Sequence, residues 1–178
     1  MKPDIYIKKI PIWYGSNPSS KIQSRYAAKF RDKIAQKLYG INDLQIQYGN
    51  QGKPFFINSK FCFNVSHSCR MVCVVFYDKP VGIDIEYIRE RVMLNQLASR
   101  FFHKDELRKF KSLDKDYSIE YFYRIWTRKE SYLKFFGIGV GENLKEFSTE
   151  GKLKNDGKDV TIVSYIKGNY YISYAYQD

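Results

Sequence analysis

The sequence predicts an α+β fold in which small antiparallel sheets pack against helices. Short segments of alternating polarity recur in both halves of the 178-residue chain, together with two long stretches of helical spacing. This length suits one compact unit, which we divide into an N-terminal half (1–80) and a C-terminal half (81–178). With 44% hydrophobic and 17% aromatic residues, the chain can form a sizeable core.

The first half is expected to contain one helix and several strands. Apolar residues recur at every fourth position from Ile22 to Leu38, which is typical of a helix. Ser19 or Ser20 can cap this helix, and Gly40 ends it. The expected strands cover residues 5–7 with 10–13, residues 44–48, and two segments within 61–77 that a turn at Ser66-His67-Ser68 separates.

The second half repeats this style. Its longest helical pattern covers 117–136 and is closed by Gly137 and Gly139. The other expected elements are a strand at 81–86, helical segments near 93–101 and 105–110, and a final hairpin of 160–166 and 170–176 with a turn at 167–169.

The chain carries 30 Lys and Arg against 19 Asp and Glu, a formal net charge of +11. An excess of this size indicates an anionic partner or ligand, and nucleic acid, an acidic protein or a polyphosphate would each satisfy it. The three cysteines are expected to be reduced thiols. Neither a secretory signal nor a membrane-length apolar run is visible, so we expect a cytoplasmic protein without a membrane partner.

Two acidic residues alternate in the strand expected at 81–86. Successive side chains of a strand point to opposite faces, so Asp84 and Glu86 share one face and lie about 7 Å apart. Carboxylates at this spacing repel each other unless a cation lies between them, and Mg²⁺ accepts carboxylate, phosphate and water oxygens. Ordinary surface acids on an exposed strand are the alternative interpretation.

In the long helix, Glu130 and Lys134 lie one turn apart at the edge of the apolar stripe. A surface ion pair worth about 0.3–0.5 kcal/mol is one interpretation of this spacing. It leaves Lys129 unexplained, because this lysine falls inside the stripe, where an unpaired ammonium is costly. A bound anion at the edge of the stripe would explain Lys129.

Potential phosphate-binding groups precede the acidic strand. Residues 64–70 place hydroxyl, imidazole and guanidinium groups in quick succession, and Lys53 lies between Gly52 and Pro54. A polar turn with a satisfied histidine, and a solvated lysine on a second turn, form the alternative interpretation.

Four motifs and one linking segment, taken in order, resemble those of the 4'-phosphopantetheinyl transferases of the surfactin-synthetase-activating type. The likeness spans roughly residues 25–147, and its strength lies in the ordered set and not in any one motif. The matching segments are Gly52-Lys53-Pro54, Phe63-Asn64-Val65-Ser66-His67-Ser68, Val81-Gly82-Ile83-Asp84-Ile85-Glu86, Phe101-Phe102-His103-Lys104-Asp105-Glu106, and Trp126-Thr127-Arg128-Lys129-Glu130-Ser131 with Lys134.

The resemblance implies a pseudo-dimer of two similar α+β halves with the active site in the cleft between them. It implies an enzyme that transfers the 4'-phosphopantetheine group of coenzyme A to a serine of an apo acyl, peptidyl or aryl carrier protein. Mg²⁺ would be required, and 3',5'-adenosine diphosphate would be released. Such an enzyme would serve fatty-acid, polyketide or nonribosomal-peptide synthesis. Two fused halves suggest a monomer, and an acidic carrier would suit the basic chain.

The same resemblance assigns roles to individual residues. The metal ligands would be Asp84, Glu86 and Glu130. The coenzyme would be bound by Lys53, Ser66, His67, Arg25, Asp84 and Lys134, with the first three at the 3'-phosphate. The catalytic residues would be Glu130, Lys134 and Glu106.

This chain departs from the family pattern at two points, and two other functions stay open. Little sequence precedes the first helix, so basic contacts found there in relatives would be missing or replaced by Lys21 and Arg25. Gly137-Ile138-Gly139 stands where relatives often have Gly-Lys-Gly. A basic nucleic-acid-binding module is one rival, although three clustered acids would repel a nucleic-acid backbone. A magnesium-dependent phosphohydrolase that uses water as the acceptor is the other.

Overall fold

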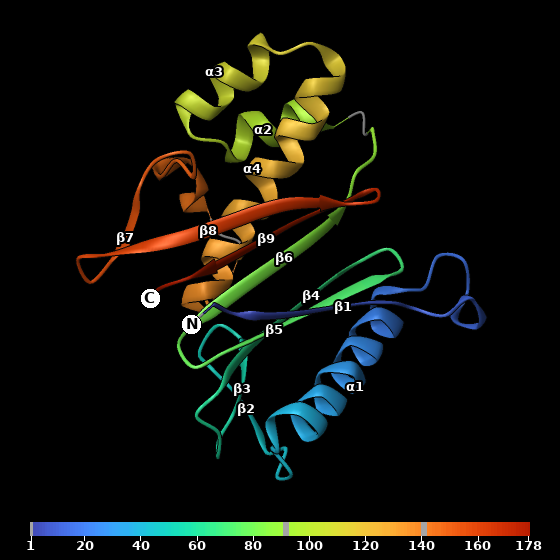
Figure 1. The fold of residues 1–178 in the computed structure, drawn as a ribbon. Coiled ribbons are helices and arrows are strands. Elements are labelled where there is room, and N and C mark those ends of the chain that lie inside the picture. The colour runs from blue at the N-terminus through green and yellow to red at the C-terminus, as the bar shows by residue number, and fades with distance from the viewer. Residues whose placement is uncertain (1, 91–92, 140–141) are drawn as a thin grey trace.

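The computed structural model describes residues 2–90, 93–139 and 142–178, which form two antiparallel sheets, a small two-stranded ladder and four α-helices (Figure 1). The strands are β1 (Asp4–Lys9), β2 (Ile46–Tyr48), β3 (Pro54–Phe56), β4 (Cys62–Ser68), β5 (Met71–Tyr77), β6 (Val81–Tyr87), β7 (Leu153–Asn155), β8 (Lys158–Lys167) and β9 (Tyr170–Tyr176). The helices are α1 (Ser20–Tyr39), α2 (Leu94–Phe101), α3 (Lys104–Ser112) and α4 (Lys115–Phe136), with short 3₁₀ turns η1 (Ile12–Tyr14) and η2 (Glu142–Glu146).

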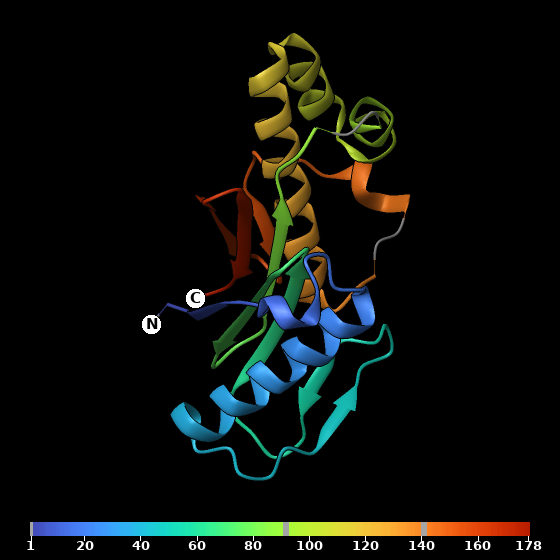
Figure 2. The same ribbon diagram turned by 90° about the vertical axis from the view of Figure 1, so that its right-hand side faces the viewer.

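The first sheet has the strand order β1-β5-β4, and α1 covers one of its faces (Figures 1 and 2). On α1, Ile34 and Ala35 are buried against Phe63 of β4 and against Val74 and Phe76 of β5. This contact buries the apolar stripe that the helical spacing predicted. The α+β arrangement of the first half therefore follows from one amphipathic helix and one half-apolar sheet face.

The second sheet has the order β6-β9-β8-β7, and α4 lies along it, with α2 and α3 gathered at the N-terminal end of α4 (Figure 1). Stacked aromatic rings hold these helices together. Phe122 of α4 stacks on Phe102, which lies between α2 and α3, with ring centroids 5.3 Å apart, and Trp126 of α4 meets Phe101 of α2 edge-on at 5.6 Å. The long helix is thereby fixed at one end by α2 and α3 and along its length by the sheet.

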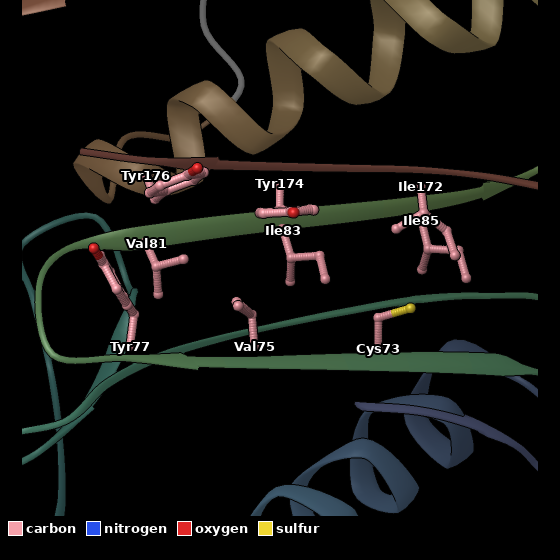
Figure 3. Packing of buried hydrophobic residues seen from close by; sticks show 9 residues of the cluster. All are labelled: Cys73, Val75, Tyr77, Val81, Ile83, Ile85, Ile172, Tyr174 and Tyr176. Atoms are coloured by element: carbon pink, nitrogen blue, oxygen red, sulfur yellow. The ribbon is translucent and has the colours of Figure 1, made fainter. Parts of the chain in front are cut away.

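A shared apolar core joins the two sheets (Figure 3). Side chains at alternate positions of β5 face this core, while those between them face α1. Because β5 is buried on both faces, its sequence is almost continuously apolar instead of alternating. The core residues are Cys73, Val75 and Tyr77 of β5, Val81, Ile83 and Ile85 of β6, and Ile172, Tyr174 and Tyr176 of β9.

Several boundaries agree with the sequence-based predictions. Helices α1 and α4 end at Gly40 and Gly137, which adopt the left-handed φ values of 64° and 72° that favour glycine at this position. The strand at β6 and the final hairpin of β8 and β9 are also confirmed. The α+β class with small antiparallel sheets is thus confirmed, while the division at residue 80 and the pseudo-dimer stay predictions.

Two predicted boundaries were wrong. The expected turn at 66–68 is part of β4, and the chain reverses instead at Cys69 and Arg70, with Cys69 at a φ of 51°. The polar residues of this segment suggested a turn, but their side chains are satisfied by β6 and α1. The opening strand stops at Lys9, and residues 12–14 after Pro11 form the turn η1. None of the helices in the described ranges has the length and apolarity needed to cross a bilayer.

Helix α4 lies directly on β6 at Gly82. A Cβ added there would overlap the carbonyl oxygen of Ser131 and the amide nitrogen of Phe135, and would lie 2.9 Å from the carbonyl carbon of Lys134. These neighbours are backbone atoms, which cannot move aside as a flexible side chain can. Gly82 therefore sets the distance between the helix and the strand.

We predict that Gly82→Ala destabilises the protein by about 3 kcal/mol or more, because overpacking against backbone requires α4 to shift. Urea unfolding followed by circular dichroism measures this change. Gly151→Ala is the matched control, because a Cβ at Gly151 would meet no atom within 4 Å and its stability should stay near that of the wild type. Equal stability of both variants would contradict the close contact.

Candidate active site

Strands β4 and β6 come together at the edges of their sheets, and side chains join them. In the described part of the chain β4 pairs by backbone only with β5, and β6 only with β9. Side-chain oxygens of β4 accept hydrogen bonds from the N–H groups on the edge of β6 that has no backbone partner within this part of the chain. The bonds run from Ile83 N to Asn64 Oδ1 (2.9 Å), from Ile85 N to Ser66 Oγ (3.3 Å) and from Tyr87 N to Ser68 Oγ (3.1 Å).

The two acidic residues of β6 point away from the apolar core, as alternation predicted, because Ile83 and Ile85 face the core. Asp84 Oδ1 accepts hydrogen bonds from Ser66 Oγ at 2.8 Å and from Lys134 Nζ at 2.6 Å. The other oxygen, Oδ2, is buried without a hydrogen-bond partner among the described residues. A buried carboxylate oxygen in this state can accept a bond from a water molecule or another hydrogen-bond donor, or can bind a cation.

Helix α4 presents Glu130 and Lys134 to the same place, one turn apart as expected. They share a cavity of about 250 Å³ with the acidic residues of β6. A strand and a distant helix therefore bring three carboxylates and one ammonium together. The cavity is lined by Val65, Ser66, His67, Asp84, Glu86, Trp126, Glu130 and Lys134.

The charged groups of this cavity shift one another's pKa values. Burial, together with the charges of Asp84 and Glu86, raises the pKa of Glu130 to about 7, and the charge of Lys134 opposes this shift. Burial lowers the pKa of Lys134, but the charges of Asp84 and Glu130 outweigh it, so this pKa is raised and Lys134 stays an ammonium. Three acids against one lysine leave the cavity with an excess of negative charge, although the protein as a whole is basic.

Two predicted coenzyme ligands, Ser66 and His67, also line this cavity. The His67 ring makes one bond at each nitrogen, from Nδ1 to Gln23 Oε1 at 2.9 Å and between Nε2 and Ser24 Oγ at 3.0 Å. Burial, together with the charge of Lys134, lowers the pKa of His67. The neutral ring thereby ties α1 to β4 at the rim of the cavity.

Lys53 lies on a second cavity of about 240 Å³, which Glu130 and Lys134 also line. Its ammonium donates to the carbonyl oxygens of Val81 at 2.9 Å and of Phe135 at 3.1 Å. Burial lowers the pKa of Lys53 to about 8. Lys53 therefore joins the first half of the chain to the start of β6 and the C-terminal end of α4.

Arg25 and Glu106 are not brought into either cavity. Arg25 is exposed on α1 and lines a separate hollow with Tyr14 and Tyr26. Glu106 is fully buried; its carboxylate accepts the amide N–H of Thr149 at 2.7 Å and that of His103 at 3.0 Å. The predicted roles of Arg25 and Glu106 stay predictions, and neither side chain touches the three carboxylates.

The buried ammonium of Lys129 has a structural explanation. Lys129 Nζ forms an ion pair with Glu106 at 2.9 Å and donates to the carbonyl oxygens of Leu144 and Phe147. The bound anion inferred from the sequence is therefore not needed to explain Lys129. Residues 103–106 form a capping box that holds Glu106 at the start of α3.

Sequence reasoning named residues 64–70 as potential phosphate donors but missed the contacts of Asn64 and Ser68 with β6. Their role depends on β6, which is remote in sequence and which they contact only after folding. The available signal was their spacing, because polar residues at 64, 66 and 68 share one face of a strand. Assigning that segment to a turn hid this pattern.

We predict that the metal-free protein becomes less stable as the pH rises from about 4.5 to about 7, in part because of Glu130. The folded state holds the proton of Glu130 after the unfolded state has released it, so unfolding is favoured as the pH increases. Glu130→Gln removes this effect. At pH 8 the free energy of unfolding of the variant should be about 2–3 kcal/mol higher than that of the wild type, and this difference should shrink toward pH 5.

Urea unfolding in EDTA at pH 5 and pH 8 measures this difference. Glu120→Gln is the control, because Glu120 lies on the same helix but is exposed. The stability of this variant should equal that of the wild type at both pH values. Equal stability of Glu130→Gln and the wild type at pH 8 would contradict the raised pKa.

Among the described residues, no three His, Cys, Asp or Glu side chains are already arranged closely enough to hold a metal ion. The acids Asp84, Glu86 and Glu130 nevertheless line one cavity and supply only carboxylate oxygens, the ligands that Mg²⁺ prefers. The partnerless oxygen of Asp84 fits the same kind of ligand. The donor set therefore suits a hard divalent cation.

Comparison with known proteins agrees with the resemblance drawn from the motifs. The model of the 4'-phosphopantetheinyl transferase superfamily matches residues 80–177, from the turn before β6 to the end of β9. A 4'-phosphopantetheinyl transferase of Bacillus subtilis is 36% identical over 126 residues, covering 69% of this chain and 54% of the relative.

Two further relatives carry similar names. The 4'-phosphopantetheinyl transferase HetI of a Nostoc species is 38% identical over 104 residues, which is 56% of this chain and 44% of the relative. The 4'-phosphopantetheinyl transferase AcpT of Escherichia coli O157:H7 is 40% identical over 92 residues, 51% of this chain and 47% of the relative. The chain spans about half the length of the curated relatives it matches. By its motifs, its fold and these matches, the chain belongs to the 4'-phosphopantetheinyl transferase superfamily.

Proposed function

We propose that this protein transfers the 4'-phosphopantetheine group of coenzyme A to a serine hydroxyl of an apo carrier protein and releases 3',5'-adenosine diphosphate. One observation carries the proposal. Asp84 and Glu86 of β6 line a single cavity with Glu130 and Lys134 of α4. Family membership and the names of the relatives support the same reaction.

The cavity would hold Mg²⁺ through Asp84, Glu86 and Glu130. Its excess negative charge and the partnerless oxygen of Asp84 support this assignment. When bound, the ion would neutralise the pyrophosphate of coenzyme A and polarise its phosphoryl oxygens. Lys134 keeps its proton and would contact the same phosphates from α4.

The residues around the cavity would hold the nucleotide end of coenzyme A. Lys53 uses two of its three N–H groups on backbone carbonyls and has one left for a phosphate oxygen. Ser66 and His67 lie on the cavity wall beside Lys134. Arg25 is on α1, next to the Ser24 that contacts His67, and would reach the nucleotide from outside. These assignments put the 3'-phosphate between the first half and α4.

The reaction would proceed by direct transfer. The serine oxygen of the carrier attacks the β-phosphorus of coenzyme A, and the bond from that phosphorus to the bridging oxygen breaks. Glu130 is the candidate base for the serine proton. Lys134 would balance the charge that builds up on the departing 3',5'-adenosine diphosphate. Glu106, held against Lys129, would contribute by keeping α3 on α4.

The carrier would be an acyl, peptidyl or aryl carrier protein, and the enzyme would act as a monomer with its two halves as a pseudo-dimer around the cleft. A net charge of +11 supports an acidic partner, because opposite charges speed encounter and the effect weakens with salt. Transfer should therefore slow as the ionic strength increases, most clearly with the most acidic carriers.

Mass spectrometry tests the proposed reaction. Incubation with coenzyme A, Mg²⁺ and an apo carrier should add about 340 Da to the carrier, the mass expected for a transferred phosphopantetheine group. Cleavage of coenzyme A without a gain on any of a panel of carriers would indicate a phosphohydrolase instead. Tight, strongly salt-sensitive binding to single-stranded nucleic acid without affinity for coenzyme A would indicate the binding module.

We predict that Glu130→Ala and Asp84→Ala each lower the transfer rate by about 10²–10⁴-fold, because each removes a carboxylate from the reacting centre. Circular dichroism should show both variants folded. Glu120→Ala removes an exposed acid from the same helix and should keep the wild-type rate. Full activity of either site variant would rule out the assigned cavity.

A further inference from the structure

Polar side chains of β4 replace a backbone ladder along the edge of β6. Buried backbone N–H groups need partners, and an unpaired strand edge leaves a row of them. Here three successive inward positions of β4 meet three N–H groups of β6 with a constant offset of 19 residues. The regular offset shows that the side chains of β4 keep register with β6 as a neighbouring strand would.

Each of the two serines in this row also donates a hydrogen bond to a carboxylate of β6, whereas the asparagine has no carboxylate opposite it. Ser66 donates to the carboxylate of Asp84 at 2.8 Å, and Ser68 donates to that of Glu86 at 2.9 Å, both with an offset of 18 residues. At the same offset Asn64 would meet Gly82, which has no side chain. Hydroxyl residues thus stand where a carboxylate must be held, and an amide oxygen stands where only an N–H must be accepted.

Each serine is fixed by this pair of bonds. A hydroxyl has one proton, so Ser68 can donate only to Glu86 while its lone pairs accept the N–H of Tyr87. Ser66 is part of the cavity wall and also accepts from Lys134. Ser68, in contrast, is buried and lines neither of the two cavities. Any influence of Ser68 on a ligand is therefore indirect, and Glu86 is the acidic cavity residue that its hydroxyl contacts.

We propose that Ser68 is a positioning residue that orients the Glu86 carboxylate toward the divalent cation; this inference rests on the proposed function. Glu86 is half-buried and is the second-to-last residue of β6, where a glutamate side chain has several rotamers. The bond from Ser68 selects one of them. Mutation of a residue that hydrogen-bonds to a metal ligand typically lowers metal affinity by about 10–100-fold.

Titration of the metal-free protein with Mn²⁺, followed by the electron paramagnetic resonance of the free ion, tests the proposal. Ser68→Ala should weaken Mn²⁺ binding by about 10–100-fold. Ser68→Thr keeps the hydroxyl and should restore binding to near the wild-type value. The Mg²⁺ concentration for half-maximal transfer should rise by the same factor in Ser68→Ala, with excess Mg²⁺ recovering most of the rate.

Two further variants keep the test decisive. Ser68→Cys preserves the volume with a much weaker donor, so it should lose Mn²⁺ affinity even if Ser68→Ala does not fold. Ser118→Ala is the control. Within the described residues this hydroxyl bonds only to the carbonyl of Lys115 at the start of α4, so its loss should leave Mn²⁺ binding unchanged.

The outcomes separate the two proposals. If Ser68→Ala or Ser68→Cys melts earlier but binds Mn²⁺ as the wild type does, Ser68 serves only the amide of Tyr87 and the positioning role is overturned. Wild-type protein that binds no Mn²⁺ would also overturn it. If the variants weaken Mn²⁺ binding while the wild type modifies no carrier, the positioning role holds and the proposed transfer reaction fails.

Discussion

The hydrogen bonds between the side chains of β4 and the backbone of β6 are the contact on which the site depends. Two sheets meet there at their edges, and the edge of β6 would otherwise bury unpaired N–H groups. Because side chains and not carbonyls satisfy β6, the same atoms can also reach the carboxylates beside those N–H groups. One row of polar residues therefore joins the halves and sets the acids of the cavity.

Close packing on both faces of β6 places the remaining groups. On one face Val81, Ile83 and Ile85 share the apolar core with β5 and β9 (Figure 3). On the other, the absence of a side chain at Gly82 lets the last turns of α4 rest on the strand. Lys134 can then reach Asp84, although the two are 50 residues apart in sequence. Lys53 reinforces this arrangement by binding backbone carbonyls of β6 and α4.

Lys129 and Lys134 of α4 illustrate two different uses of charge. Lys129 is fully enclosed and fully paired, with Glu106 and two carbonyls, so it stabilises the contact of α3 and η2 with α4. Lys134 is partly exposed and faces three carboxylates that it cannot all neutralise. The surplus negative charge around Lys134 favours the binding of a cation, whereas the fully paired Lys129 has no N–H group left for a ligand.

Residue patterns within short windows were sufficient for much of this molecule. Helical spacing of apolar residues and a terminal glycine identified α1 and α4, and alternation placed Asp84 and Glu86 on one strand face, because these features depend on local backbone geometry. Long-range contacts settled the rest. Ser66 to Ser68 are strand and not turn because they pair with β5, while β6 and α1 bind their side chains. Lys129 is tolerated because it forms an ion pair with Glu106. Such partners lie many residues away, so no local window contains them, and packing alone selects which of several plausible partners each polar group finds.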